Sequence, residues 1–448
     1  MNMIKLPPDS KLLDPSFTFG VATASFQIEG ANQEDGRLPS IWDTFCATPG
    51  KVFNGDDGSI ACDHYHRWQD DIELISQLNV DAYRLSIAWP RVLDKDGALN
   101  DKGVQFYRNL LTALKAKGIR TFVTLYHWDL PQYLEDLGGW VNRQTAYRFA
   151  EYVDVITKAL GDLVDSWATF NEPFCAAILG YEYGIHAPGH KNHRLGRQAA
   201  HHILLAHGLA MPIIRRNCPN SQAGIVLNMN RTYAASASPD DRFAALIRDT
   251  LDNHFFIAPL LTGAYPKLLG RVLPDYLPVI AEGDLEIIAQ PIDFLGLNYY
   301  TCNHNRFHPE RIFEDVKNSE PAEYTDIGWE IAPHAFTELL VELNQQYTLP
   351  PLFITENGAA CADSLVDGTV DDDQRVRYIN SHLQAVDAAI NAGVDIRGYF
   401  AWSLMDNFEW AEGYNKRFGL IYVDYRTQER TIKRSGHVFK DFLASRKA

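Results

Sequence analysis

Two glutamates, Glu172 and Glu356, occupy equivalent settings in two separate parts of the chain. Glu172 comes at the end of 166-SWATFNEP-173, and Glu356 comes near the end of 352-LFITENG-358. Each stretch is a short apolar run with β-branched and aromatic residues, closed by a chain-breaking residue, which predicts a buried strand. A single glutamate after a strand is ordinarily an exposed loop acid. Two glutamates in the same setting favour a shared site, because a buried carboxylate needs a polar partner.

Two carboxyl groups that face each other across a pocket can cleave a glycosidic bond. The leaving oxygen needs a proton, and the sugar carbon needs a nucleophile or an activated water, so one carboxyl must be protonated and the other ionised. Arg84 lies on another predicted strand, and its permanent charge would keep Glu356 ionised while Glu172 keeps its proton. The alternative for Arg84 is a structural ion pair with a different acid.

Other residues at or just beyond predicted strand ends combine aromatic faces with hydrogen-bonding groups. A pyranose ring presents apolar C–H faces and a rim of hydroxyls, so this mixture suits a sugar. For any one of these residues, a packed core aromatic or a loop cap is an equally good interpretation. Together they favour a sugar site. They are Gln27, His127, Trp128, Asn171, Asn298, Tyr300, Trp402, Glu409 and Trp410.

Apolar strands and amphipathic helices alternate along the chain. Continuous apolar strands that alternate with helices indicate a parallel sheet covered by helices. The predicted helices with one apolar face span 68–78, 100–117, 146–160, 198–215 and 376–390. The predicted strands span 17–26, 82–87, 121–128, 166–170, 223–229, 294–300, 352–356 and 396–404. Residues 301–334 show no clear period and are predicted to be an inserted loop.

Eight such strands predict an α/β fold, a single (β/α)8 TIM barrel with inserted βα loops. Glu172 then ends the fourth strand and Glu356 the seventh. The active site of this fold lies at the carboxyl ends of the strands, so we expect the two glutamates to meet there. The 448 residues contain no linker or low-complexity tract. We therefore expect residues 1–448 to form one catalytic domain.

Composition restricts the partners and the compartment. A formal net charge of −16 argues against nucleic acid and anionic membranes. No signal peptide or membrane span is recognisable, and the six cysteines show neither CxxC nor framework spacing, which is typical of reduced thiols in the cytoplasm. The expected partner is a small-molecule substrate, and a homo-oligomer is left open.

No metal and no cofactor are expected. The histidines lack HExxH or Cys/His spacing, so we interpret them as helix-face or core residues. No GxGxxG or P-loop follows a strand, which argues against a nucleotide cofactor. The stretch 184-GIHAPG-189 is predicted to be a shaped loop near the site. The histidines considered are His64, His66, His201, His202 and His207.

Six motifs spread over essentially the whole chain resemble those of glycoside hydrolase family 1, the β-glucosidase family. The TFNEP and ITENG pair, in that order, is highly specific. One small departure is Phe26, where the family often has tyrosine. The motifs are 17-FTFGVATASFQIEG-30, 126-YHWDLPQ-132, 169-TFNEP-173, 296-GLNYY-300, 353-FITENG-358 and 402-WSLMDNFEW-410.

The resemblance implies a role for each matching residue. Glu172 would be the general acid/base and Glu356 the nucleophile of a retaining double displacement. Arg84 and Tyr300 would lie against the nucleophile. The implied substrate-binding residues are Gln27, His127, Trp128, Asn171, Asn298, Trp329, Trp402, Glu409, Trp410 and Phe418.

We therefore expect a retaining β-glycosidase that removes terminal non-reducing β-D-glucosyl residues from cello-oligosaccharides and from aryl or alkyl β-glucosides. One alternative is a 6-phospho-β-glycosidase of the same family, since Lys416 follows in the same loop. Those relatives characteristically have a serine in place of Glu409 and a tyrosine near Phe418, which disfavours this alternative. The other is a non-catalytic sugar-binding protein, which would not need a matched acid and nucleophile.

Overall fold

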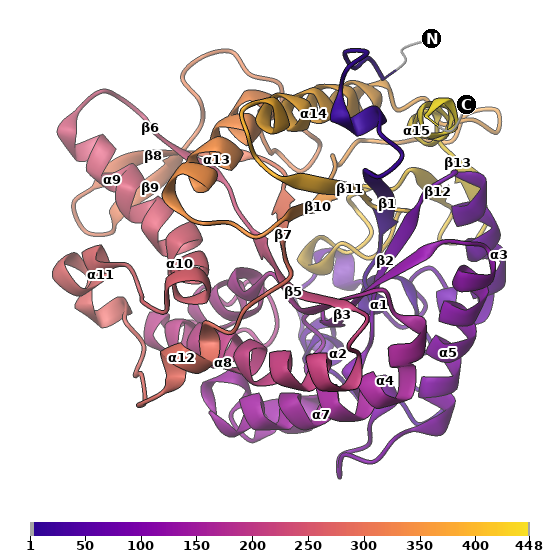
Figure 1. Ribbon diagram of the computed structural model, residues 1–448, viewed down its shortest axis with the longest axis horizontal. Coiled ribbons are helices and arrows are strands. Elements are labelled where there is room, and N and C mark those ends of the chain that lie inside the picture. The colour runs from indigo at the N-terminus through magenta and orange to yellow at the C-terminus, as the bar shows by residue number, and fades with distance from the viewer. Residues whose placement is uncertain (1–3, 447–448) are drawn as a thin grey trace.

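A closed barrel of eight parallel strands lies at the centre of the computed structural model, which describes residues 4–446 (Figure 1). Around the barrel the strand order is β1-β2-β3-β4-β5-β7-β10-β11, and β11 pairs with β1 to close it. The predicted (β/α)8 fold is thus confirmed. The strands are β1 (Thr18–Ala22), β2 (Ala82–Ser86), β3 (Arg120–Tyr126), β4 (Ser166–Asn171), β5 (Gln222–Asn228), β7 (Phe294–Tyr299), β10 (Leu352–Asn357) and β11 (Ile396–Trp402).

Helices surround the barrel as an outer ring (Figure 1). In α5, the residues predicted to form its apolar face, Val104, Tyr107, Leu111 and Leu114, are all buried. The long helices are α3 (His64–Gln77), α5 (Asp101–Ala116), α7 (Gln144–Leu160), α8 (His193–Asn217), α13 (Pro333–Gln346), α14 (Asp373–Asn391) and α15 (Arg434–Ser445). The shorter ones are α1 (Ser25–Ile28), α2 (Ile41–Ala47), α4 (Trp89–Val92), α6 (Gln132–Asp136), α9 (Pro239–Asp249), α10 (Phe255–Thr262), α11 (Lys267–Val272) and α12 (Asp284–Ile288).

Burial on both faces explains why the barrel strands are continuous apolar runs. Every residue of β1, β2, β4, β7 and β10 is buried, with one face toward the barrel interior and the other toward the helices. Three phenylalanines pack together inside the barrel. The ring centroid of Phe122 lies 5.5 Å from that of Phe353 and 4.9 Å from that of Phe400. These rings fill the interior of the barrel at this level.

The structure corrects two predicted elements. The first strand ends at Ala22, because the chain turns at Ala24 into α1 (Ser25–Ile28). The stretch 301–334, predicted to be an inserted loop, does lie between β7 and α13, but it contains regular structure that the sequence did not indicate. It contains β8 (Cys302–His308) and β9 (Ile312–Val316), an antiparallel pair that joins β6 (Arg231–Ala234) in a small sheet. Polar residues dominate β8, so no apolar alternation marks it in the sequence.

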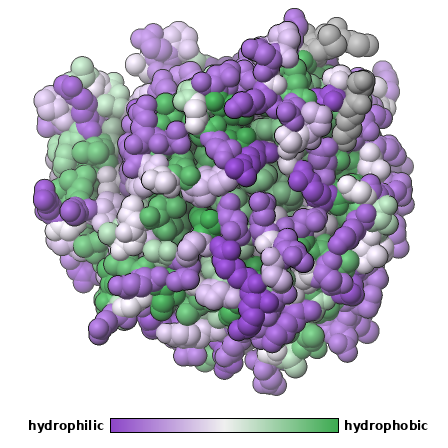
Figure 2. Space-filling view, viewed as in Figure 1, coloured by the Kyte–Doolittle hydropathy of each residue, from purple (hydrophilic) through white to green (hydrophobic). Residues whose placement is uncertain are grey.

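This small sheet lies with α9 at the edge of the molecule, left of the barrel in Figure 1. A second small sheet pairs β12 (Ile421–Val423) with β13 (Arg430–Ile432). The visible face in Figure 2 is largely hydrophilic, with apolar side chains scattered among polar ones. Among residues 4–446, no helix combines the length and apolarity that crossing a bilayer requires.

Candidate active site

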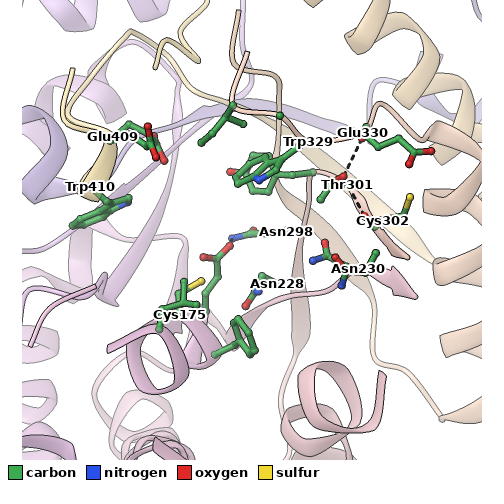
Figure 3. A pocket seen from close by; sticks show the side chains of 18 of the residues that line it. Cys175, Asn228, Asn230, Asn298, Thr301, Cys302, Trp329, Glu330, Glu409 and Trp410 are labelled. Atoms are coloured by element: carbon green, nitrogen blue, oxygen red, sulfur yellow. Dashed lines mark hydrogen bonds between the residues drawn. The ribbon is translucent and has the colours of Figure 1, made fainter. Parts of the chain in front are cut away.

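A pocket of about 670 Å³ opens where the barrel strands end. Figure 3 shows aromatic, amide and carboxylate side chains from several strands and loops around it. Eleven of the predicted site residues line it: His127, Trp128, Glu172, Asn298, Tyr300, Trp329, Glu356, Trp402, Glu409, Trp410 and Phe418. The other three, Gln27, Arg84 and Asn171, are buried behind this lining and hold the residues that form it.

Glu356, in β10, is held by two donors, one from β2 across the barrel and one directly after the adjacent strand β7. Arg84 donates from Nη1 to Oε1 of Glu356 (2.6 Å), and the hydroxyl of Tyr300 donates to Oε2 (2.5 Å). Both the Arg84 and Glu356 side chains are almost fully buried. A buried carboxylate with a guanidinium partner is stabilised in its ionised form. Gly358 allows this strand to lie against β11, since a Cβ there would come within 1.8 Å of the Trp402 carbonyl oxygen.

Glu172, directly after β4, has a different environment. Its carboxylate accepts a hydrogen bond from Nδ2 of Asn298 (2.7 Å) and also contacts Cys175. Burial, reinforced by the nearby negative charge of Glu356, raises the pKa of Glu172 to about 8. A carboxyl with such a pKa is protonated near neutral pH and can donate a proton. Glu172 is therefore suited to donate a proton, whereas Glu356 is held by a cation.

An amide network links the two glutamates. Asn171 Oδ1 accepts from Arg84 Nη2 (2.7 Å) and from Asn298 Nδ2 (3.0 Å), and Thr355 donates to Asn298 Oδ1 (2.7 Å). Nδ2 of Asn171 lies 3.1 Å from Nε2 of His127. Because each member is buried and bonded to others, the network restricts the positions of both carboxyl groups.

Glu409 is a third buried carboxyl in the same pocket. Burial, and then the charges of Glu356 and Glu172, raise its pKa to about 8. Gln27 hydrogen-bonds to Glu409 and donates from Nε2 to the carbonyl oxygen of Phe408 (2.8 Å). Buried polar atoms around this position, Glu409 Oε2, Gln27 Oε1 and His127 Nδ1, have no protein partner in residues 4–446. Such orphaned atoms fit a ligand that brings its own hydroxyls.

Indole rings form one wall of the pocket. The Trp410 ring lies 4.5 Å from that of Trp128 and stacks on Phe26 at 6.0 Å, so Phe26 supports the wall. Trp402 stacks parallel to His127, with centroids 6.1 Å apart. Burial lowers the pKa of His127 well below its ordinary value, with Arg84 adding to the shift, so this imidazole is neutral.

Three residues of the pocket lining have an uncommon backbone conformation. Positive φ angles occur at Trp128 (79°), Glu172 (49°) and Trp410 (50°). Residues other than glycine seldom adopt this backbone conformation. Such residues concentrate at functional sites, where the surrounding structure maintains them. On the opposite side of the pocket, Trp329 packs against Tyr300 (5.3 Å) and Phe418 (6.0 Å).

Comparison with known proteins identifies the family. The profile of Glycosyl hydrolase family 1 matches residues 10–448. The chain belongs to glycosyl hydrolase family 1. It is 47% identical to a β-glucosidase of Agrobacterium sp. over 94% of this chain and 93% of that protein. It is 44% identical to β-glucosidase A of Thermotoga maritima over 99% and 98% of the two chains.

Solved structures of family 1 members have the same fold. The crystal structure of the family 1 β-glucosidase from Exiguobacterium antarcticum B7 is similar to this chain with a TM-score of 0.94 and 45% identity, covering 97% of this chain and 98% of that one. The predicted family and enzyme class, a glycoside hydrolase, are therefore confirmed.

Sequence reasoning missed several residues of this family 1 pocket. Asn228 ends β5 and lines the pocket, so the strand-end rule that found Asn171 would have found it too. Cys175 contacts Glu172 from a π-helical segment, Cys175–Glu182, and no sequence signal marked it. The predicted loop 184–189 does reach the pocket, through Ile185 and His186.

The histidines that we interpreted as helix-face or core residues, and not as metal ligands, lie in helices and have protein partners. His64 pairs with Asp71 (2.7 Å) and His201 with Asp284 (2.9 Å). His207 lies 2.7 Å from the hydroxyl of Thr169, and burial lowers its pKa to about 3. These contacts fit the interpretation of core histidines.

A different cluster in the pocket lining contains three side chains with metal-ligating atoms. They are Cys302, His304 and Glu330.

Proposed function

We propose that this protein is a retaining β-glucosidase that releases terminal non-reducing β-D-glucosyl residues from cello-oligosaccharides and from aryl or alkyl β-glucosides. One observation carries the proposal. Glu356, bound by the Arg84 guanidinium, and Glu172, whose pKa is raised to about 8, share a pocket with aromatic walls. The buried atoms Glu409 Oε2, Gln27 Oε1 and His127 Nδ1 in this region have no protein partner in residues 4–446 and can bind sugar hydroxyls. The related proteins named β-glucosidase support the same substrate.

In the first proposed step, a carboxylate oxygen of Glu356 attacks the anomeric carbon while Glu172 gives its proton to the leaving oxygen. The C–O bond to the aglycone breaks, and an ester bond joins the sugar to Glu356. In the second step Glu172, now ionised, takes a proton from water. The resulting hydroxide attacks the anomeric carbon, and the ester bond to Glu356 breaks.

The environment of each glutamate supports its proposed role. Arg84 and Tyr300 hold Glu356 by hydrogen bonds to separate oxygens, so they orient the nucleophile and stabilise it when it leaves the sugar. Negative charge on Glu356 raises the pKa of Glu172. Formation of the ester neutralises Glu356, so the pKa of Glu172 falls when it must act as a base.

An unphosphorylated sugar fits the pocket better than a 6-phospho sugar. Lys416 is bound to Asp326, donating to its carboxylate (3.0 Å) and to its carbonyl oxygen (2.8 Å). Phe418 offers no hydroxyl to a phosphate, and Glu409 would repel one when ionised. A dianion would therefore enter a pocket that already holds three carboxyl groups, which is unfavourable.

Two measurements on the purified protein test this function. The value of kcat/KM for nitrophenyl β-glucoside should exceed that for its 6-phosphate by orders of magnitude. The first product seen by NMR should be the β-anomer, because the proposed double displacement retains configuration. Equal or faster turnover of the phosphorylated substrate, or an α-anomer as first product, would contradict the proposal.

We also propose that residues 1–448 form one catalytic domain that works in the cytosol. Pairing of β1 with β11 joins the first and last strands of the barrel, which supports a single folding unit. All six cysteines are buried free thiols, which suits a reducing compartment. A single cooperative unfolding transition in calorimetry would agree with the first point, and two separate transitions would contradict it.

A further inference from the structure

Three potential metal ligands converge at the wall of the pocket, apart from the glutamate pair. Cys302 and His304 are two residues apart on β8, so their side chains lie on the same face of that strand. Glu330 reaches them from the loop before α13. The ligating atoms all lie within 4.8 Å of one another, and Figure 3 shows the Cys302 sulfur and the Glu330 carboxylate on neighbouring segments.

The two distances from Nε2 of His304 are close to those of a tetrahedral zinc site. Sγ of Cys302 lies 3.6 Å from Nε2 of His304, and that nitrogen lies 3.0 Å from Oε2 of Glu330. Zinc bonds of about 2.0 Å to nitrogen or oxygen and about 2.3 Å to sulfur place tetrahedral ligand atoms about 3.3 to 3.5 Å apart. A zinc ion would therefore need only small movements of side chains that already point to one place.

Surrounding residues hold the three side chains in this arrangement. Asn318 donates from Nδ2 to Oε1 of Glu330 (2.9 Å), which leaves Oε2 for the cluster. The ring of His304 stacks on Tyr233, with centroids 5.4 Å apart. Thr301 donates to the carbonyl oxygen of Glu330 (3.0 Å) and so ties the loop to the start of β8. Outer contacts of this kind orient ligands and strengthen metal binding.

We propose that Cys302, His304 and Glu330 form a Zn²⁺ site whose fourth position, filled by water, opens into the pocket. All three residues line the pocket, so solvent reaches the side of the cluster that has no protein ligand. Thiolate and imidazole ligands select zinc over Mg²⁺ or Ca²⁺, which prefer oxygen. Binding displaces the thiol proton of Cys302 to solvent. The site is separate from the glycosidase chemistry and does not depend on it.

Sequence inspection missed this cluster for a clear reason. A Cys-x-His spacing on a strand is not among the common zinc spacings, and the third ligand comes from a distant loop. Only the path of 301–334 across the barrel mouth brings Glu330 to β8.

Direct metal binding to the full-length protein tests the site without an activity assay. Protein cleared of metal with a chelator is titrated with Zn²⁺ in competition with a chromogenic indicator. It is also titrated with Co²⁺, whose bond to a thiolate gives a near-ultraviolet charge-transfer band. We expect one equivalent of Zn²⁺ and a Co²⁺–thiolate band in the unmodified protein. Asn318→Ala should weaken Zn²⁺ binding about 10- to 100-fold.

Cys302→Ser should abolish the Co²⁺ band and lower Zn²⁺ affinity by about 100-fold or more, since it removes a direct ligand. Cys46→Ser is the matched control, because Cys46 is similarly buried (9% against 7% exposed) and lies in α2, outside the cluster. It should bind Zn²⁺ as the unmodified protein does. If Cys302→Ser does not fold, by circular dichroism, His304→Gln and Asn318→Ala carry the test.

Three results would overturn the proposal. They are no stoichiometric Zn²⁺ binding by the unmodified protein, no thiolate band with Co²⁺, and unchanged affinity in the folded variants of the cluster. In each of these cases the three side chains would be a hydrogen-bonded support for the loop and not a metal site.

Discussion

Nη1 of Arg84 lies 2.6 Å from Oε1 of Glu356, and both side chains are almost wholly removed from solvent. Glu172, in the same pocket, is held instead by a neutral amide, Asn298. The two glutamates therefore have different electrostatic surroundings within one cavity. A buried carboxylate beside a guanidinium stays ionised, and a buried carboxyl beside an amide and another negative charge keeps its proton.

Replacing Arg84 with glutamine should therefore slow catalysis. We expect kcat/KM to fall by about 100-fold or more, because the change removes a preorganised donor that stabilises the charge of Glu356 as it leaves the sugar. Arg397→Gln, which breaks an exposed ion pair with Asp395, serves as control and should keep normal activity. Near-normal kcat/KM in folded Arg84→Gln protein would argue against the assigned partnership.

Alanine variants of the two glutamates should differ in how their activity depends on the leaving group of the substrate. Glu356→Ala should lose turnover of all glycosides, and added azide should restore release of the aglycone and yield an α-glycosyl azide. Glu172→Ala should retain the first step with activated aryl glucosides, since a good leaving group needs little protonation. The measurement is kcat/KM across aryl glucosides of graded leaving-group pKa. Identical behaviour of the two variants would make the role assignment wrong.

Activity should decline on the alkaline side as Glu172 loses its proton. Its pKa is raised to about 8, so the acid form persists through neutral pH and disappears as the pH rises past that value. We expect an alkaline limb in kcat/KM well above the ordinary carboxyl range. In Glu172→Gln, assayed with dinitrophenyl glucoside, this limb should be absent. Its persistence would assign it to another group, with Glu409 the first to consider.

Trp402 should act as a platform for the sugar ring. It lines the pocket and stacks with His127, although only 5% of it is exposed. Trp402→Ala should therefore lower kcat/KM far more than Tm. Trp402→Phe, which keeps an aromatic face, should recover part of the activity. A large loss of Tm with near-normal kinetics in the folded protein would instead show that the indole fills the core.

Much of this site was predictable because its residues follow a positional rule. In a parallel barrel the carboxyl ends of all strands meet at one mouth, so strand-end residues such as Glu172, Asn298 and Trp402 converge even though they are far apart in sequence. Apolar runs locate those strands, because both of their faces are buried. The sequence alone therefore determined the barrel, the glutamate pair and the strand-end residues of the pocket lining.

Other features were decided only by tertiary structure. Burial and neighbouring charge set the raised pKa values of Glu172 and Glu409, and these depend on distances that no spacing in the chain encodes. The strand β8 could not be recognised in the sequence, because most of its side chains are polar and only partly buried. The approach of Glu330 to Cys302 and His304 likewise depends on how a long insertion folds over the barrel mouth, since its contacts are non-local.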